Sequence, residues 1–194
     1  MQEKHEAIPN ADRRAAMKAR LIAAARQIFL DKGYAETSTP EIVKAAEVTR
    51  GALYHHYKDK EDLFRAVVTA EAAALAQAID TAADPDENPL AQGSAAYFEA
   101  MAAPGRARLL LVDGPAVLGW DEMDAIDAGG GRASLRVGLS HAAPDLDPAE
   151  LEALAITLSA AYDRAALAIA EGAKAAPYIT VLERLVVSAG EENR

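Results

Sequence analysis

Apolar residues recur every three or four positions between residues 11 and 32, which is the spacing of an amphipathic helix. Gly33 follows this stripe and can end the helix, because glycine readily adopts the left-handed conformation found at helix ends. The apolar positions are Leu21, Ile22, Ala25, Ile28 and Phe29. The pattern therefore predicts a long first helix.

Two short helices joined by a tight turn are predicted next. Ser38 can cap the first of them, with Glu41 completing a capping box and Pro40 tolerated in the first turn. Residues 47–48 fit the turn, and Thr49 can cap the second short helix. This order of helix, turn and helix predicts a DNA-binding helix-turn-helix.

The second short helix is predicted to have an inward and an outward face. Leu53 and Tyr57 lie four residues apart and share the inward face. Adjacent histidines also suggest metal binding, but successive helix positions diverge by about 100 degrees and no Cys or further His lies nearby. We therefore expect no metal site and no cofactor. The outward positions are Arg50, Tyr54, His55 and His56.

A fourth helix and a separate helical body complete the predicted architecture. Asp59 can cap the fourth helix, whose apolar face starts at Leu63 and whose alanine-rich continuation runs to about residue 83. A polar, proline-bearing break over residues 83–89 then separates the two parts. The glycines at 129–131 are compatible with a flexible interruption within one helix or with a true loop. Body helices are predicted at about 89–103, 105–112, 115–128, 132–142, 148–173 and 177–189, with no competing strand pattern.

The net charge of −10 is distributed unevenly along the chain. Residues 1–65 carry six Lys and six Arg against four Asp and six Glu, a net charge of +2, whereas residues 66–194 carry 8 basic and 20 acidic residues, a net charge of −12. Nucleic-acid binders usually present a basic surface, so only the N-terminal part suits a polyanion. The predicted organisation is a helix-turn-helix domain over residues 1–65, with a flexible tail over residues 1–12, and a helical body over residues 66–194.

The composition argues against several other protein classes. Zero cysteines remove disulfides, a thiol nucleophile and thiolate metal ligands. No unbroken apolar run approaches about 18 residues, so no membrane span is expected, and the polar start of the chain lacks the apolar core of a signal peptide. Cytoplasmic residence is the resulting expectation. Ser140 and His141 are neighbours without a recognisable third catalytic group, so no enzyme activity and no catalytic residue are expected.

Several motifs together resemble one known family. The first helix closes with Phe29-Leu-Asp-Lys-Gly-Tyr34, followed by Thr37-Ser-Thr39, Glu41-Ile42 and Val48-Thr-Arg-Gly-Ala-Leu-Tyr-His-His-Tyr-Lys-Asp-Lys-Glu-Asp-Leu63. Over roughly residues 14–68 the chain resembles the N-terminal signature of bacterial tetracycline-repressor-type (TetR) transcriptional regulators. Tyr57 stands where that family more often has phenylalanine. The resemblance implies an all-α fold, with an N-terminal three-helix helix-turn-helix DNA-binding domain plus a C-terminal helical ligand-binding and dimerisation domain.

The second helix of a helix-turn-helix lies in the major groove, with its N-terminal residues nearest the base edges. Arg50 could donate to a guanine or clamp a phosphate, and the small residues after it could touch the duplex or only serve helix packing. Basic residues of the N-terminal segment, such as Arg13 and Arg14 beside Lys4, Lys18 and Arg20, could lie along phosphates or belong to a solvated tail. The resemblance carries the family's contact role onto Tyr54, His55 and His56, one of which could instead stabilise the domain. The candidate DNA contacts are Thr39, Thr49, Arg50, Gly51, Ala52, Tyr54, His55, His56 and Lys60.

The body is predicted to hold a ligand pocket and a dimer interface. Bulky side chains of its central helices could line an apolar cavity, although residues of this kind more often form plain core. Candidate pocket residues are Tyr97, Phe98, Met101, Trp120, Met123 and Tyr162. The alanine-rich helix after Asp147 allows close approach of another helix, and the last helix is amphipathic. The candidate interface residues are Leu154, Leu158, Ala161, Ala165, Leu182, Leu185 and Val186.

The combined expectation is a ligand-responsive transcriptional regulator. It would bind a palindromic double-stranded operator as a homodimer, act as a repressor, and be released by a small, apolar effector that prefers a dimer with wrongly spaced DNA-binding domains. A ligand-independent or activating DNA-binding protein of the same fold is the alternative. A helical enzyme is the remaining one, and it lacks a recognisable catalytic set.

Overall fold

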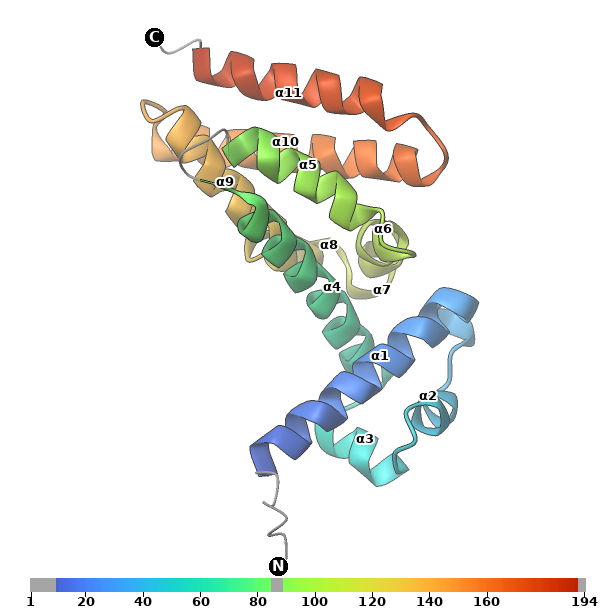
Figure 1. Ribbon diagram of the computed structural model, residues 1–194. Coiled ribbons are helices and arrows are strands. Elements are labelled where there is room, and N and C mark those ends of the chain that lie inside the picture. The colour runs from blue at the N-terminus through green and yellow to red at the C-terminus, as the bar shows by residue number, and fades with distance from the viewer. Residues whose placement is uncertain (1–9, 85–88, 192–194) are drawn as a thin grey trace, which may run out of the picture. The chain divides into compact units, whose positions relative to one another are not determined.

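The computed structural model describes residues 10–84 and 89–191, and its side chains over residues 11–84 and 89–185. Within those ranges every regular element is a helix and no strand occurs (Figure 1). The fold is therefore all-α, as predicted. The chain divides into two compact units, Met1–Val67 and Val68–Arg194, two residues after the predicted boundary at residue 65. The polar break over residues 83–89 does not separate the two parts as predicted, because it lies within the second unit. Of the flexible tail expected over residues 1–12, residues 1–9, including Lys4, lie outside the described residues, and residues 10–12 belong to the first helix instead.

The first unit contains α1 (Asn10–Glu36), α2 (Thr39–Ala45), α3 (Arg50–His56) and the start of α4 (Lys60–Ala82). Aromatic rings join α1 to α4 in its core, where the Phe29 and Phe64 centroids lie 5.0 Å apart, edge to face. α2 and α3 contribute Ile42 and Leu53, both fully buried. These apolar positions are the ones whose helical spacing predicted the elements, so their burial is what fixes the three-dimensional arrangement of this unit.

The first helix is interrupted at Gly33, as its position after the apolar stripe predicted. Gly33 has a φ of +79°, and a short helical segment continues beyond it to Glu36. Thr37 then secures the chain, because its hydroxyl donates to the Gly33 carbonyl at 2.7 Å and its side chain is buried. Glycine is needed here because a side chain would strain this backbone conformation.

The caps of the helix-turn-helix form as predicted. The Glu41 carboxylate accepts hydrogen bonds from the Ser38 backbone N–H at 3.0 Å and from the Ser38 hydroxyl at 2.8 Å. Between the helices Glu47 has a φ of +52°, which closes the turn. Thr49 then accepts from the Ala52 backbone N–H at 3.1 Å and so caps α3.

The body differs from the sequence prediction in its middle helices. The predicted break near residue 113 is absent, because helical structure continues from Arg106 through a π-helical turn to Leu118. The chain breaks at Gly119 instead, where φ is +83°. At residues 129–131 a true turn separates two helices, which decides between the two alternatives left open by the sequence. The elements are α5 (Pro89–Met101), α6 (Arg106–Arg108), η1 (Leu109–Asp113), α7 (Gly114–Leu118), α8 (Trp120–Ala128), α9 (Gly131–Ala142), α10 (Pro148–Ala170) and α11 (Ala175–Glu191).

α10 is the central helix of the body, where it contacts α9 and lies beside α11 (Figure 1). Among the described helices it is the one long and apolar enough to cross a membrane by composition, with a mean hydropathy of 1.3. Unbroken apolar runs in the sequence did not identify this helix as a candidate span. Its many alanines raise the mean hydropathy, while scattered polar residues interrupt every apolar run. α10 nevertheless buries Leu158, Tyr162 and Ala165 in the body, which is the behaviour of a core helix.

A buried ion pair fastens α4 to α6 within the body. Arg106 Nε donates to Glu71 Oε2 at 2.9 Å, and the two side chains are only 14% and 11% exposed. Arg106 also donates to the Ala100 carbonyl at 2.7 Å. Because a buried charge without a partner is costly, each of these groups depends on the other.

Candidate nucleic-acid interface and body cavities

The outward face of α3 carries a linked set of polar side chains. The Arg50 guanidinium lies over the Tyr54 ring, 5.5 Å from its centroid. The Tyr54 hydroxyl lies 3.2 Å from the Thr39 hydroxyl on α2, and this contact lowers the pKa of Tyr54. Tyr54 is 43% exposed although it is a large aromatic residue. The three side chains therefore hold one another in place on the surface, across both helices of the motif.

The start of α3 offers little steric bulk. Thr49 and Gly51 are exposed, and Ala52 is partly exposed. A methyl group added at Gly51 would have the Thr49 hydroxyl as its nearest neighbour, at 3.9 Å, so it would point into open space. A bulky binding partner can consequently come close to the backbone of α3 at this point.

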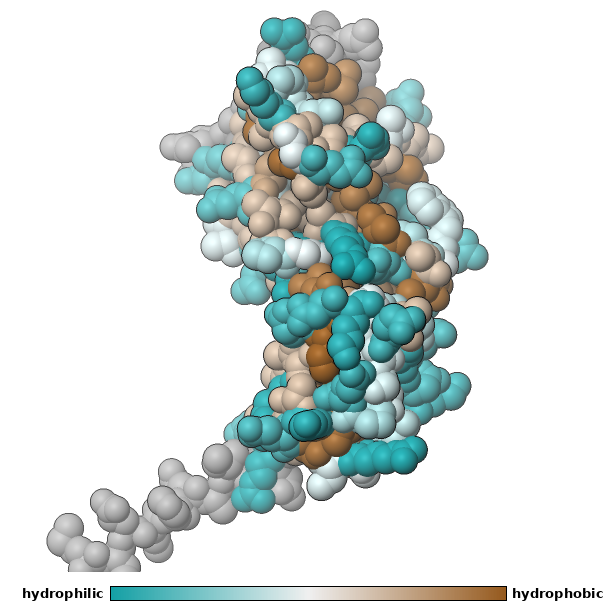
Figure 2. Space-filling view, turned by 90° about the vertical axis from the view of Figure 1, so that its right-hand side faces the viewer, coloured by the Kyte–Doolittle hydropathy of each residue, from teal (hydrophilic) through white to brown (hydrophobic). Residues whose placement is uncertain are grey.

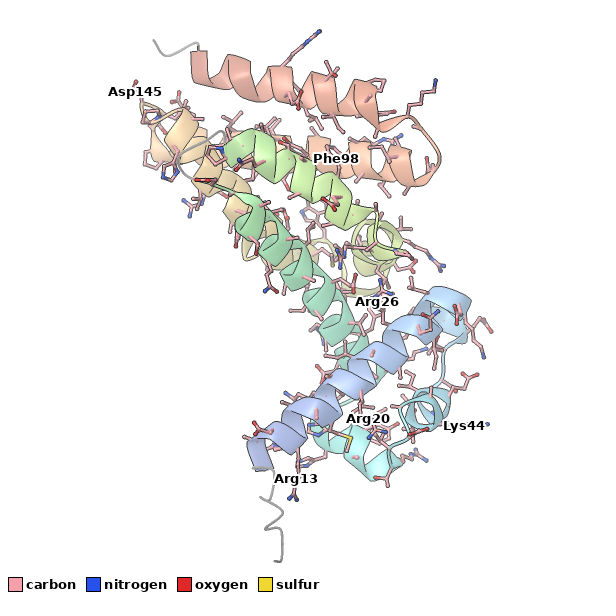
Figure 3. The ribbon with its side chains drawn as sticks, in the orientation of Figure 1. Arg13, Arg20, Arg26, Lys44, Phe98 and Asp145 are labelled. Carbon is pink, nitrogen blue, oxygen red and sulfur yellow. The ribbon has the colours of Figure 1, made fainter. Side chains whose placement is uncertain are left out.

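A groove of about 590 Å³ runs between the start of α1 and the outer side of α3. Arg13 and Arg14 border it from α1, and His55 and His56 border it from α3. Figure 3 shows Arg13 projecting from the first turns of α1. The pKa of His56 is lowered by partial burial and by the nearby positive charges of His55, Lys18 and Arg14. On the face drawn in Figure 2, hydrophilic side chains gather over the first unit.

Two basic residues of this unit have structural roles that the sequence did not indicate. Lys60 was predicted to contact DNA, but its ammonium donates to the carbonyls of Tyr34 at 2.8 Å and Thr37 at 2.9 Å. Arg20, drawn in Figure 3, donates to the Ala46 carbonyl at 2.7 Å. Both side chains donate to carbonyls at or just beyond the ends of helices, where regular backbone hydrogen bonding stops. Lys60 therefore keeps only its backbone amide for an anion.

The Glu41 carboxylate serves a second contact besides the cap. It forms an ion pair with Lys32 of α1, which joins α1 to α2. Hydrogen bonds from Lys32 and then from Ser38 lower the pKa of Glu41 to about 2. Glu41 therefore both caps α2 and links α2 to α1 within the first unit.

Among the hollows that the described residues of the body form, two have volumes of about 310 and 340 Å³, a size found for small-molecule sites. The first, cavity 1, lies between α4, α5, α9 and α10, and its apolar wall includes Leu75, Ile79 and Leu90. The second, cavity 2, includes Met101, Leu110 and several other side chains of the central helices. Five residues line both cavities: Leu75, Asp127, Gly131, Ser159 and Asp163.

The predicted pocket residues divide between the two cavities. Tyr97 and Tyr162 line cavity 1. Met101, Trp120 and Met123 line cavity 2, and Trp120 is 75% exposed. Phe98 lines neither and instead packs on the rings of Tyr97 and Tyr162, at 5.2 and 5.7 Å between centroids. The six residues therefore do not form one pocket.

The acidic lining of the cavities was not predicted from the sequence. Asp163 accepts a hydrogen bond from the Tyr97 hydroxyl at 2.8 Å, and burial raises the pKa of Asp163 to about 6. Asp127 accepts from the Ser159 hydroxyl at 3.1 Å and lies 3.5 Å from Arg132 Nε. A signal was present, because Asp163 follows Tyr162 and lies four residues after Ser159, on the apolar side of the predicted helix.

The predicted interface residues also divide into two groups. Leu158, Ala165 and Leu182 are buried within the body, so they serve its own core. Leu185 is 49% exposed, and Leu154 and Ala161 are partly exposed. The side chain of Val186 lies outside the described residues. The solvent-facing apolar stripe of α11 is Tyr178, Val181 and Leu185.

Comparison with known proteins identifies the architecture. Residues 21–67 match the family described as "Bacterial regulatory proteins, tetR family". Residues 88–187, more than half of the chain, match "Tetracyclin repressor-like, C-terminal domain". The chain belongs to the TetR family.

Individual relatives of this TetR-family regulator agree with the assignment. It is 32% identical to a TetR-family transcriptional regulator from Pectobacterium atrosepticum, with a TM-score of 0.64 over 92% of this chain and 95% of that one. The fatty acid degradation regulator FadR from Bacillus halodurans has the same fold, with 16% identity and a TM-score of 0.72 over 88% of this chain and 94% of that one. The regulator QacR from Staphylococcus aureus is 40% identical over 55 residues, which are 28% of this chain and 29% of QacR. The chain thus aligns with less than a third of that curated relative. Its membership of the TetR family makes it a DNA-binding transcriptional regulator.

Proposed function

We propose that this TetR-family protein is a ligand-responsive repressor that acts in the cytoplasm and binds a near-palindromic operator as a homodimer. The observation that carries the proposal is that Arg50 and Tyr54 are exposed, yet are held by contacts with each other and with Thr39. Side chains held in one geometry lose less conformational entropy on binding than free ones. Arg50 is thereby oriented to donate to a base edge or a phosphate.

The groove between α1 and α3 supplies the neighbouring phosphate contacts in this proposal. Arg13, Arg14 and Lys18 are exposed, and no ion-pair partner for them occurs among the described residues. His55 and His56 border the same groove and can donate to phosphate oxygens. Thr49, Gly51 and Ala52 complete the proposed contact surface as the part of α3 nearest the bases.

The apolar stripe of α11 supports dimerisation. Tyr178, Val181 and Leu185 are 37%, 54% and 49% exposed and share one helix face. Exposed apolar patches of this kind mark protein interfaces. Val181→Glu is expected to shift the protein from dimer to monomer in light scattering after size exclusion, because it places a charge in the interface. Glu183→Lys, on another side of α11, is the control, and a monomer already in the unmodified protein contradicts this part of the proposal.

Release by a small molecule is supported by the two cavities in the body. An effector that binds better to a dimer unfit for DNA lowers operator affinity, and operator must lower effector affinity by the same factor. Equal effector affinity with and without operator contradicts this coupling.

Footprinting on the DNA upstream of the protein's own gene tests operator binding. We expect protection of a short inverted repeat overlapping promoter elements, as repression requires. Arg50→Ala should weaken binding by about 5- to 150-fold, because one bidentate contact is worth about 1 to 3 kcal/mol. Lys174→Ala removes the same charge from an exposed position in the body and should leave affinity unchanged. Equal effects of the two substitutions, or no footprint, overturn the proposal.

A further inference from the structure

Cavity 1 differs from an ordinary apolar pocket in the charge of its lining. It carries three carboxylates, Asp80, Asp127 and Asp163, and no lysine or arginine among the described residues that line it. His141 also lines it, but this side chain is exposed and its Nδ1 contacts the Val137 carbonyl at 2.7 Å. The surroundings of the cavity are therefore strongly negative.

The three carboxylates are not equally compensated. Asp80 is exposed to solvent, which screens its charge. Asp127 faces the Arg132 guanidinium, which is itself buried. Asp163 has the Tyr97 hydroxyl as its partner and no basic group within ion-pair distance in the described part of the chain. A partly buried carboxylate without a cation is unfavourable, so a bound cation would be stabilised there.

Aromatic and hydroxyl groups surround the same carboxylate. Tyr97 and Tyr162 both line the cavity, with ring centroids 5.3 Å apart, and ring faces attract cations. The Tyr162 hydroxyl is held by a hydrogen bond to the Ser94 hydroxyl, and Ser94 lines the cavity as well. Aliphatic side chains of α4, α5 and α9 form the rest of the wall: Leu75, Ile79, Leu90, Leu135 and Val137.

We propose that cavity 1 binds an organic cation, a molecule with an apolar body of roughly two fused rings and a protonated amine placed against Asp163. This assignment rests on the proposed function, since it names the chemical class of the effector. An anion is excluded by the three carboxylates, and a neutral apolar molecule leaves Asp163 without a counter-charge. Cavity 2 shares Asp127 and Asp163 with cavity 1, but its lining is less negative, because Arg132 and Arg164 offset two of its three aspartates.

A matched series of probes tests the charge preference. We choose 1-naphthylmethylamine, the neutral 1-naphthalenemethanol and the anionic 1-naphthoate, which share one ring system and differ in charge. Calorimetric titration at neutral pH should show the amine binding about tenfold or more tighter than the alcohol, as expected for one additional ion pair of about 1.4 kcal/mol. The naphthoate should not bind detectably. An alcohol that binds as tightly as the amine, or failure of all three at about 1 mM, overturns the proposal.

Variants locate the effect within the cavity. Asp163→Asn should lower amine affinity about tenfold and leave alcohol affinity within about twofold. Asp121→Asn, at an exposed position outside the cavity, is the control and should change neither. Equal loss for amine and alcohol in Asp163→Asn assigns that residue a structural role and overturns the proposal. Footprinting without probes separates failure of this inference from failure of the proposed function. If the protein binds DNA but no amine, only the assigned ligand class is wrong. If it binds the amine but no DNA, the proposed repressor function is wrong.

Discussion

Replacing Lys60 by methionine tests whether the first unit depends on this side chain for its internal structure. The ammonium makes two short hydrogen bonds, at 2.8 and 2.9 Å, and a longer one of 3.4 Å to the Ala35 carbonyl. It also lies 4.3 Å from the Tyr34 ring centroid. Hydrogen bonds to a charged group contribute about 1.5 to 3 kcal/mol each, and a partly exposed cation–π contact about 0.5 to 1 kcal/mol.

Water can replace part of these contacts, because Lys60 is only partly buried. We therefore expect Lys60→Met to lower the opening free energy of the first unit by about 2 kcal/mol, less than the sum of its contacts. Hydrogen exchange detected by mass spectrometry should show the slowest amides of α1 exchanging about 30-fold faster, since 1.36 kcal/mol corresponds to a factor of ten. Peptides of the body serve as an internal reference.

Lys58→Met is the matched control, because Lys58 is exposed and its ammonium has no partner among the described side chains. It should leave exchange in α1 unchanged. If Lys60→Met exchanges like the unmodified protein, or if both substitutions accelerate exchange equally, the capping role assigned to Lys60 is wrong.

Three further predictions concern separate features. Gly51→Ala should stabilise α3 by about 0.5 to 1 kcal/mol in chemical unfolding, because the added methyl makes only an ordinary contact with the Thr49 hydroxyl at 3.9 Å. It should weaken operator binding, because the methyl faces the proposed DNA surface; unchanged operator affinity argues against close approach of the duplex here. Glu71→Gln should destabilise the body by about 3 kcal/mol in urea unfolding, because it leaves Arg106 buried without a counter-charge. Glu71→Leu combined with Arg106→Leu should recover part of that loss. If Glu71→Gln leaves the free energy of unfolding unchanged, the buried pair is contradicted. Asp163 has a folded-state pKa raised to about 6, above the unfolded value of about 3.9, so its stability contribution is fully present below about pH 4 and is lost as pH rises through 6. Asp163→Asn should therefore become more stable relative to the unmodified protein across that interval in thermal unfolding, and parallel stability profiles of the two proteins are the contrary result.

The helix-turn-helix was predictable from the sequence because its determinants are local. The capping box of Ser38 and Glu41, the cap at Thr49 and the interruption at Gly33 each depend on residues within a few positions of one another. The same spacing rules identified Leu53 and Tyr57 as inward-facing, and both are buried. Family resemblance then supplied the function expected of this local structure.

The features that the sequence did not predict depend on distant contacts. The ammonium of Lys60 reaches carbonyls more than twenty positions earlier in the chain, which no helical period reveals. In the body, helical structure passes Asp113 and Gly114 through a π-helical turn, so a proline at residue 115 does not mark a break. Leu182 and Leu185 lie three residues apart on α11, yet the first is buried and the second exposed, because packing rather than spacing decides which edge of an apolar stripe is covered.

Two glycines set the capacity of cavity 1. A methyl group added at Gly138 would lie 2.7 Å from Leu90 Cδ2, and one added at Gly93 would lie 3.4 Å from Ile79 Cγ2. Single-methyl changes at these positions would reshape the chamber while leaving every residue of the helix-turn-helix untouched. The chemical selectivity of the proposed effector site can consequently diverge by small mutational steps during evolution, or be retuned in a biosensor, while the proposed DNA contacts of α3 stay the same.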